Sequence, residues 1–210
     1  MYTVALIAGK GGAGKTTTAT ALAVAAAAAG SRVLLLDLDP QESARRWGAA
    51  RGDVAPLVTV EASDAARLGA RLRSAAPSYD VTVIDTPPSA ASTARAAAQA
   101  AAGGLVVIPV RPSPHDLRTV RETLDLVRGA KAPFLLAVTQ GSARTRLTVE
   151  TVEALAALGP LGPMLSRLDV FAASAADGLT PLDVEPRGRA ASEIRTLWQQ
   201  IAGRLVDKTT

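Results

Sequence analysis

The chain contains no cysteine, one histidine and only 3% aromatic residues. The absence of cysteine excludes disulfides, cysteine-ligated zinc and iron–sulfur clusters held by cysteine, and it suits a reducing cytoplasm. The histidine, His115, lies at an expected helix start, where we expect a surface or capping role rather than catalysis. Because alanine supplies much of the apolar content, the buried side chains are small and the helices should pack closely.

Long apolar runs are also missing. The longest, residues 21–29, has nine residues, whereas a membrane-spanning helix needs about 20. The opening residues MYTVALIAG lack the basic start of a secretion signal. No linker divides the chain, so we expect a single cytoplasmic domain over residues 1–210. The net charge of +4 permits contact with a polyanion without requiring one.

Short β-branched runs alternate with stretches of helical composition. The runs are TVALIA at 3, RVLLLDLD at 32, LVTV at 57, YDVTVID at 79, GLVVIPV at 104 and PFLLAVT at 133. Their nearly continuous apolar character is typical of parallel strands covered on both faces. Capping signals place helices at 16–29, 113–129 and 148–160, and loops at 159–163 and 178–188. The pattern predicts an α/β fold with a doubly wound, mostly parallel sheet flanked by helices.

The stretch GKGGAGKTT, residues 9–17, matches the phosphate-loop pattern G-x-x-x-x-G-K-[ST]. It follows a predicted strand and opens a predicted helix, as such a loop should. Its glycines let backbone N–H groups wrap phosphates, and the helix N-terminus adds partial positive charge. Lys15 would neutralise the terminal phosphates, and Thr16 would offer a hydroxyl to magnesium. We expect a nucleoside triphosphate with Mg²⁺, bound by Gly11, Gly12, Ala13, Gly14, Lys15, Thr16 and Thr17.

Carboxylates follow two of the predicted strands. VTVIDTPP ends its strand with Asp85, where a Walker B aspartate would hold magnesium through water, and the loop from Thr86 would sense the γ-phosphate. LLLDLDPQ carries Asp37 and Asp39, which should project from the same face of their strand because they are two residues apart. Acids at strand ends also occur as simple helix caps, and this alternative stays open.

These motifs, in this order and spacing, carry a family resemblance. KGGAGKTTT, LLLDLDPQ, VIDTPP and VIPVRPSPHDL resemble the deviant Walker A ATPases of the ParA/MinD group. DPQESARRWGAA and the short length without an N-terminal DNA-binding domain resemble the small ParF-like branch of that group, and SARTRL at 142 is similar to ParA proteins. The resemblance covers nearly the whole chain. It implies a slow, partner-stimulated ATPase that dimerises on binding ATP.

The resemblance also gives the second lysine of the loop, Lys10, a role. In this group the matching lysine reaches across a nucleotide-sandwich dimer to the phosphates of the other subunit, which offsets the cost of burying two triphosphates. No glutamine or glutamate follows Asp85 to place the attacking water, and Asp39 matches the aspartate that does so in the family. The implied catalytic residues are Lys10, Lys15 and Asp39. Thr16 would bind Mg²⁺ directly, and Asp85 and Asp39 through water. The adenine is expected between TQG at 139 and PLDVEPRG at 181.

ParA-like proteins hold nonspecific DNA as ATP dimers and release it when a partner stimulates hydrolysis. The segment 187–204 has four arginines and one acid, and the DNA-binding candidates are Arg167, Arg189 and Arg195. A solvated arginine-rich helix face remains the alternative. The resemblance implies a nucleoid-associated protein that segregates plasmid or chromosomal DNA with a ParB/ParG-like centromere-binding partner. Positioning of a protein cargo such as carboxysomes, through a cargo adaptor, is the alternative function.

A MinD-like membrane-associated ATPase is the competing class. An apolar stripe precedes the final VDKTT, formed by Ile194, Leu197, Trp198, Ile201 and Leu205. We expect this stripe, and Trp47, to pack in the core, so that no membrane contact is expected. A dethiobiotin-synthetase-like ligase stays possible, but it does not explain Lys10.

Overall fold

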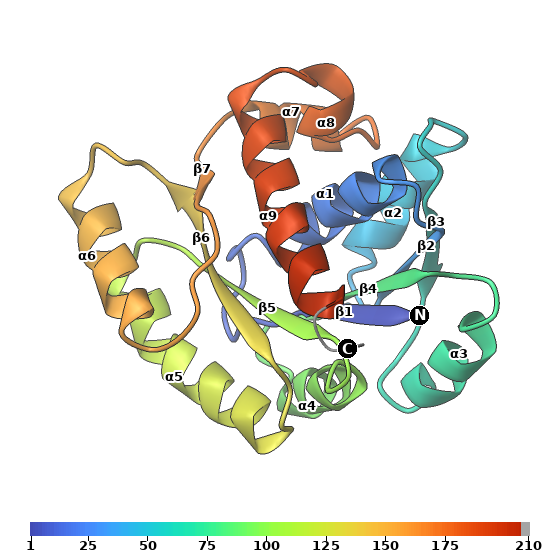
Figure 1. Cartoon of the computed structure of the whole chain (residues 1–210), viewed down its shortest axis with the longest axis horizontal. Coiled ribbons are helices and arrows are strands. Elements are labelled where there is room, and N and C mark those ends of the chain that lie inside the picture. Colours follow the sequence, from blue (N-terminus) through green and yellow to red (C-terminus); the bar gives the residue numbers. More distant parts are fainter. Residues whose placement is uncertain (207–210) are drawn as a thin grey trace.

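A computed structural model describes residues 1–206 of the chain. At its centre is a seven-stranded sheet in the order β3-β2-β4-β1-β5-β6-β7, and all paired neighbours run parallel (Figure 1). The strands are β1 (Tyr2–Leu6), β2 (Val33–Asp37), β3 (Thr59–Ala62), β4 (Val81–Asp85), β5 (Leu105–Val110), β6 (Phe134–Gly141) and β7 (Leu165–Ser166). The predicted fold class is thus confirmed.

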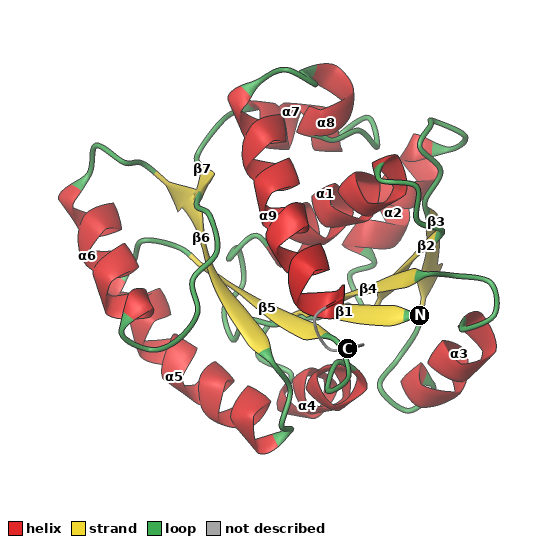
Figure 2. Ribbon diagram, in the orientation of Figure 1, coloured by secondary structure: helices red, strands yellow, loops and turns green. Residues whose placement is uncertain are grey.

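Helices cover both faces of the sheet (Figure 2). One layer contains α1 (Lys15–Ala28), α2 (Ser43–Arg51), α7 (Val170–Ala175), α8 (Pro181–Val184) and α9 (Arg189–Val206). The other layer contains α3 (Leu68–Ala75), α4 (Ala91–Ala100), α5 (Pro114–Gly129) and α6 (Arg146–Ala156).

Two hydrophobic clusters fill the space between the sheet and these layers. Along β1, Val4 and Leu6 enter the cluster beneath α1 and α9, whereas Ala5 enters the opposite cluster. Both faces of the strand are therefore buried, which explains its continuous apolar sequence. The alanines of α1 lie at 4% exposure or less from Ala19 to Ala26, so this helix approaches the sheet closely, as its small side chains predict.

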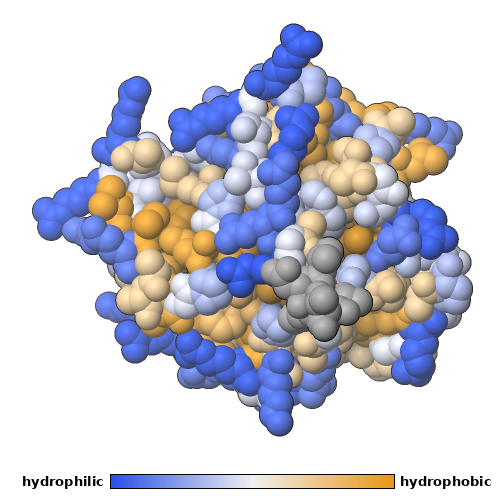
Figure 3. Space-filling view, viewed as in Figure 1, coloured by the Kyte–Doolittle hydropathy of each residue, from blue (hydrophilic) through white to orange (hydrophobic). Residues whose placement is uncertain are grey.

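The apolar stripe of α9 packs inward, as predicted. All five of its residues are buried in the cluster that α9 shares with α1, and Figure 3 shows hydrophilic side chains along the outer side of α9. Trp47 is likewise buried, and His115 is exposed at the start of α5. Within residues 1–206, no helix is long and apolar enough to cross a bilayer. The last four residues of VDKTT lie outside the described residues.

Two local predictions were incomplete. The segment 178–188 was predicted as a loop, but it contains the one-turn helix α8, which begins with Pro181 and a capping box formed by Thr180 and Asp183. The two-residue strand β7 was not predicted, because so short a run carries no periodic signal.

The sheet order places the carboxyl end of β1 between those of β4 and β5. The strands β2, β3 and β4 lie on one side of β1 in the sheet, and β5, β6 and β7 lie on the other. The crevice at the carboxyl end of β1 is therefore a topological switch point. In open α/β sheets ligands bind in this crevice. The loop that carries the glycine-rich motif begins there.

Candidate functional site

The loop between β1 and α1 is held through its carbonyl oxygens. Thr139 Oγ1 donates to the carbonyl of Ala13 (2.8 Å), and Gln140 Nε2 donates to that of Gly12 (2.9 Å). Ser89 Oγ donates to the carbonyl of Gly9 (2.9 Å). Among the described residues, the backbone N–H groups from Gly9 to Gly14 make no such bond. The loop thus has its carbonyl oxygens bound by other parts of the protein, while its N–H groups remain available. This arrangement suits a loop that binds an anion.

The start of α1 adds further open N–H groups. Gly14 caps the helix in the left-handed conformation (φ +88°) without a side-chain hydrogen bond, and the first bond of the helix runs from Thr18 N–H to the Gly14 carbonyl (2.8 Å). The preceding N–H groups are therefore free to bind phosphate, as expected at a helix N-terminus. Gly12 also has positive φ, +74°, which glycine adopts without strain.

Lys15 lies in this loop as a buried cation, with 6% of its surface exposed. Its Nζ donates to the Lys10 carbonyl at 3.1 Å, and it forms no ion pair with the described residues. Burial lowers the pKa of Lys15, although the charges of Asp85 and Asp39 partly oppose this. An anionic ligand would supply the charge that this ammonium group lacks.

Thr16 and Asp85 form the second part of the site. Thr16 Oγ1 donates to Asp85 Oδ2 at 2.6 Å, whereas Asp85 Oδ1 is buried without a hydrogen-bond partner in the described structure. Burial raises the pKa of Asp85 to about 7, the Thr16 hydrogen bond opposes the rise, and the charge of Asp37 adds to it. A hydroxyl beside a carboxylate with one uncommitted oxygen fits Mg²⁺, which prefers oxygen ligands and water.

Asp37 and Asp39 do not share a strand face, so that prediction was wrong. The strand β2 ends at Asp37, and the chain turns because the Asp37 carboxylate accepts the N–H groups of Asp39 and Arg45, both at 3.0 Å. Asp37 thus binds backbone N–H groups just before and at the start of α2. Asp39 uses one oxygen to accept the Gln41 N–H at 2.9 Å, and it lies at the more open edge of the site.

A cavity of about 370 Å³ opens beside the loop on the β6 side. It is lined by Gly14 and Thr17, by Thr139 and Gln140 of the TQG segment, and by residues 165–169, Phe171, Ala172 and Ala175. The segment 181–188, expected on its far side, does not line it. In that segment both oxygens of Asp183 bind the buried Arg51, at 3.0 and 3.1 Å.

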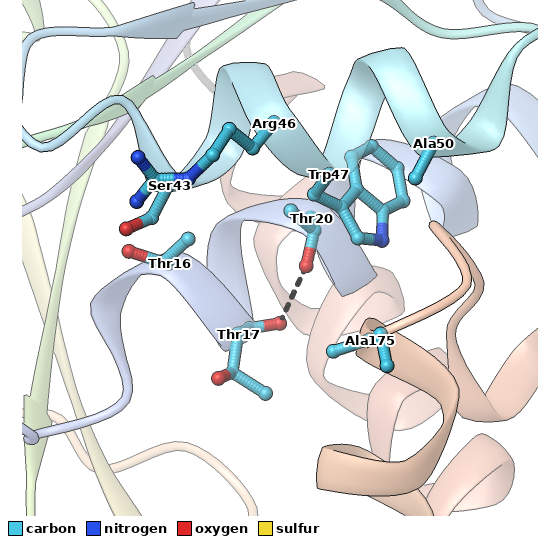
Figure 4. Close-up of a pocket in the computed structure, with 9 residues that line it drawn as sticks. Thr16, Thr17, Thr20, Ser43, Arg46, Trp47, Ala50 and Ala175 are labelled. Carbon is cyan, nitrogen blue, oxygen red and sulfur yellow. Dashed lines mark hydrogen bonds between the residues drawn. The ribbon is translucent and has the colours of Figure 1, made fainter.

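A second cavity, of about 400 Å³, lies between α1 and α2. Figure 4 shows Thr16 and Thr20 on α1 facing Ser43, Arg46 and Trp47 on α2, with the Arg46 side chain extending back toward Ser43 and Thr16. Thr17 and Ala175 line both cavities. The site is therefore open on two sides of the first turn of α1.

The three DNA-binding candidates lie near β7 and α9 but differ in their contacts. Arg189 pairs with Glu193 at 2.8 Å and donates to Ser166 Oγ at 2.7 Å. Arg195 is exposed and donates to the Pro186 carbonyl at 2.6 Å. Arg167 is exposed, its side chain makes no hydrogen bond or ion pair with the described residues, and it also lines the cavity on the β6 side. Arg167 therefore has the cation most available to a ligand.

The residues that support the loop from outside were not predicted from the sequence. Ser89 and Thr139 were assigned no contact with the loop. Ser89 follows β4, which is adjacent to β1, and Thr139 lies near the carboxyl end of β6, which is one strand beyond β5. Polar residues at these positions are a usable signal, because the carboxyl ends of parallel strands meet at one edge of the sheet.

Comparison with known proteins identifies the family. Residues 4–195 match the CobQ/CobB/MinD/ParA nucleotide binding domain. The carboxysome distribution protein A of Halothiobacillus neapolitanus is 32% identical, over 95% of this chain and 96% of its own length. The protein of the same name from Gloeobacter kilaueensis is 40% identical over 58% of this chain, a match that spans 54%, about half, of that relative.

The fold agrees with these matches. The ATP complex of an alanine variant of McdA from Cyanothece has a TM-score of 0.80 at 17% identity, and the match covers 98% of this chain and 96% of that one. The predicted ParA/MinD group is thus confirmed, and the cofactors are ATP and Mg²⁺. The chain is a P-loop ATPase and belongs to the CobQ/CobB/MinD/ParA nucleotide binding domain family.

Proposed function

We propose that this chain is an ATP-dependent dimerising switch that positions a protein cargo, such as carboxysomes, along nucleoid DNA. The observation that carries the proposal is the similarity to a carboxysome distribution protein over nearly the full length of both chains. The two lysines of the phosphate loop support it, since a face-to-face dimer requires additional positive charge at the phosphates. Residues 1–210 would act as one domain.

In the proposed cycle, residues 11–17 bind the phosphates and Lys15 neutralises them. Thr16 would bind the magnesium ion directly, and Asp85 and Asp39 would bind it through water. Asp39 would also orient the attacking water, since its second oxygen makes no bond with the described residues. Lys10 would reach the nucleotide of the second copy. The adenine would occupy the cavity beside Thr139 and Phe171, which offers apolar walls.

The ATP dimer would hold nonspecific DNA through Arg167 and Arg195, with a smaller part for Arg189, whose charge is offset by Glu193. A cargo adaptor would stimulate hydrolysis and release the dimer. Affinity for DNA would then fall steeply as salt rises, because bound counterions are released on binding.

Segregation of plasmid or chromosomal DNA by a ParF-type partition ATPase is the second candidate. The segment DPQESARRWGAA, residues 39–50, favours it. In that case the stimulating partner would be a ParB/ParG-like centromere-binding protein. The two candidates share the ATP switch and differ only in what the partner carries.

The switch is tested by light scattering of the purified protein with Mg²⁺ and a non-hydrolysable ATP analogue or ADP. We expect a dimer with the analogue and a monomer with ADP. Lys10→Ala should bind nucleotide as a monomer but lose the dimer and the turnover. A wild-type protein that stays monomeric with saturating analogue would refute the proposed switch.

The cargo is tested by deleting the gene in its own host. We expect a protein assembly to lose its even spacing while plasmids are retained. Plasmid loss with normal spacing of protein assemblies would select the segregation alternative. A binding assay with vesicles and ATP provides the matching test of the membrane-associated class, for which we expect no binding.

A further inference from the structure

The motif VIPVRPSPHDL has no role in the proposed cycle, although its Asp116 lies beside Gly9 and Lys10 of the phosphate loop. The strand β5 ends at Val110 and α5 begins at Pro114. Arg111 and Asp116 of this junction form a forked ion pair, with Nε to Oδ2 at 2.9 Å and Nη2 to Oδ1 at 3.3 Å. The Asp116 side chain is only 4% exposed and that of Arg111 is 32% exposed. The carboxylate therefore fixes the plane of the guanidinium.

The remaining nitrogen of Arg111 lies against the phosphate loop. Nη1 makes no hydrogen bond with the described residues, and it lies 3.2 Å from the position that a Cβ on Gly12 would occupy. Gln140 binds the carbonyl of the same glycine. The apex of the loop, Gly12, is thus held between one side chain from the end of β5 and one from β6.

The helix α5 supports the first half of the loop in the same way. A Cβ on Gly9 would lie 3.7 Å from Thr123 Oγ1 and 3.8 Å from Thr119 Cβ. Asp116 and Thr119 also line a small void together with Gly9 and Lys10. The segment that carries Lys10 therefore rests on α5 and on the Arg111–Asp116 pair.

We propose that Arg111, fixed by Asp116, is a positioning residue that holds the loop apex so that Lys10 is presented to a second copy of this chain. This inference rests on the proposed ATP-driven dimer. The charge of Arg111 is offset by Asp116 at hydrogen-bond distance, so the pair adds little net charge at the phosphates. Its contribution is geometric, and a lysine, which cannot form the fork, does not replace the arginine.

Loss of Arg111 should affect dimerisation more than binding of nucleotide to one subunit. The N–H groups that would bind phosphate lie in a loop whose carbonyls are bound by Ser89, Thr139 and Gln140, and these bonds remain in an Arg111 variant. Gly12 itself is exposed and lies two residues from Lys10. Looser packing at this apex changes the direction of Lys10 while the inner surface of the loop stays formed.

The experiment compares Arg111→Ala, Arg111→Lys and Asp116→Asn with Arg118→Ala, a control at an exposed position of α5 that has the same charge change as Arg111→Ala. Affinity for fluorescent ADP and ATP-analogue-driven dimerisation by light scattering are measured for each. We expect ADP affinity within about threefold of wild type and a dimer dissociation constant raised by about tenfold or more in the three test variants. Arg118→Ala should match wild type in both assays.

Dimerisation of Arg111→Ala at the wild-type constant would overturn the proposal, and so would full rescue by Arg111→Lys, which would indicate charge rather than position. If Arg111→Ala does not fold, Arg111→Lys and Asp116→Asn carry the same expectation. Failure of the wild-type protein to dimerise would instead overturn the proposed switch, and with it this inference. The wild-type arm therefore separates the two outcomes.

Discussion

Asp37 and Asp85 are register partners on the neighbouring strands β2 and β4, so two carboxylates meet at the carboxyl edge of the sheet. Both are buried, at 1% and 0% exposure. Burial raises the pKa of each, and the charge of Asp37 adds to the rise at Asp85. A site that concentrates negative charge in this way favours a divalent cation, and it makes the nucleotide-free protein sensitive to pH.

The first prediction concerns that sensitivity. Folding raises the pKa of Asp85 from 3.8 to about 7, so between these pH values the folded state binds a proton that the unfolded state has lost. The free energy of unfolding should therefore fall as pH rises from 4 to 7, by on the order of 4 kcal/mol from this residue. Asp85→Asn should remove most of the slope, and Asp37 should supply what remains.

Urea denaturation without nucleotide or Mg²⁺, in steps from pH 4.5 to pH 8, measures this dependence. Asp64→Asn is a suitable control, because Asp64 is exposed. Equal slopes for wild type and Asp85→Asn would show that the buried carboxylate is not the source.

The second prediction concerns Asp39. Its replacement by alanine should slow phosphate release by at least tenfold, since a positioned acid–base group typically contributes about 10²–10⁴-fold. The phosphate loop remains intact, so ATP should still drive dimerisation of the variant. The variant dimer should persist with ATP, whereas the wild-type dimer should persist only with a non-hydrolysable analogue. Phosphate release and light scattering on the same sample measure both effects. Hydrolysis at the wild-type rate in Asp39→Ala would remove this residue from the mechanism.

The sequence was sufficient to predict the features that are determined by residues close together in the chain. The phosphate loop needs glycines, a lysine and a threonine at fixed spacing, and Asp85 follows directly on an apolar strand. The helix predicted at 113–129 is α5, from Pro114 to Gly129. In each case the signal lies within a few residues of the feature.

Features that depend on distant segments were not predictable in this way. Thr139 and Gln140 bind the loop from 126 and 128 residues away, and Arg51 binds Asp183 across 132 residues. The prediction that Asp39 shares a strand face with Asp37 was wrong for a different reason. The Asp37 side chain binds the backbone N–H of Asp39 and ends the strand, a turn that competes with β-structure.

The third prediction follows from Arg51, which joins α2 to the segment that contains α8. Its side chain is 1% exposed, it binds both oxygens of Asp183, and it donates to the carbonyls of Gly178 and Pro56. Its removal leaves Asp183 without its buried partner, so Arg51→Ala should cost about 3–5 kcal/mol. For a chain of this size, the melting temperature should fall by roughly 6–20 °C.

Arg45→Ala on the same helix is the control for Arg51. Arg45 pairs with Glu42, and the two side chains are 56% and 39% exposed, so its loss should cost about 1 kcal/mol or less. Calorimetry of both variants separates a buried pair from a surface pair. Equal melting temperatures would contradict the structural role of Arg51.

The fourth prediction tests the DNA surface. Arg167 is exposed and unpaired among the described residues, so Arg167→Ala should weaken ATP-dependent DNA binding by a similar factor on unrelated sequences. It should also reduce the slope of log affinity against log salt by about one for each subunit that contacts a phosphate.

Arg73→Ala provides the control for net charge, because Arg73 is exposed on α3, in the opposite helix layer. Fluorescence anisotropy with two duplexes of unrelated sequence, at several salt concentrations, measures both variants with ATP and with ADP. A uniform loss confined to Arg167→Ala supports direct contact with the DNA backbone. An equal loss in both variants would instead indicate that the total charge of the protein, rather than the surface near β7 and α9, governs binding.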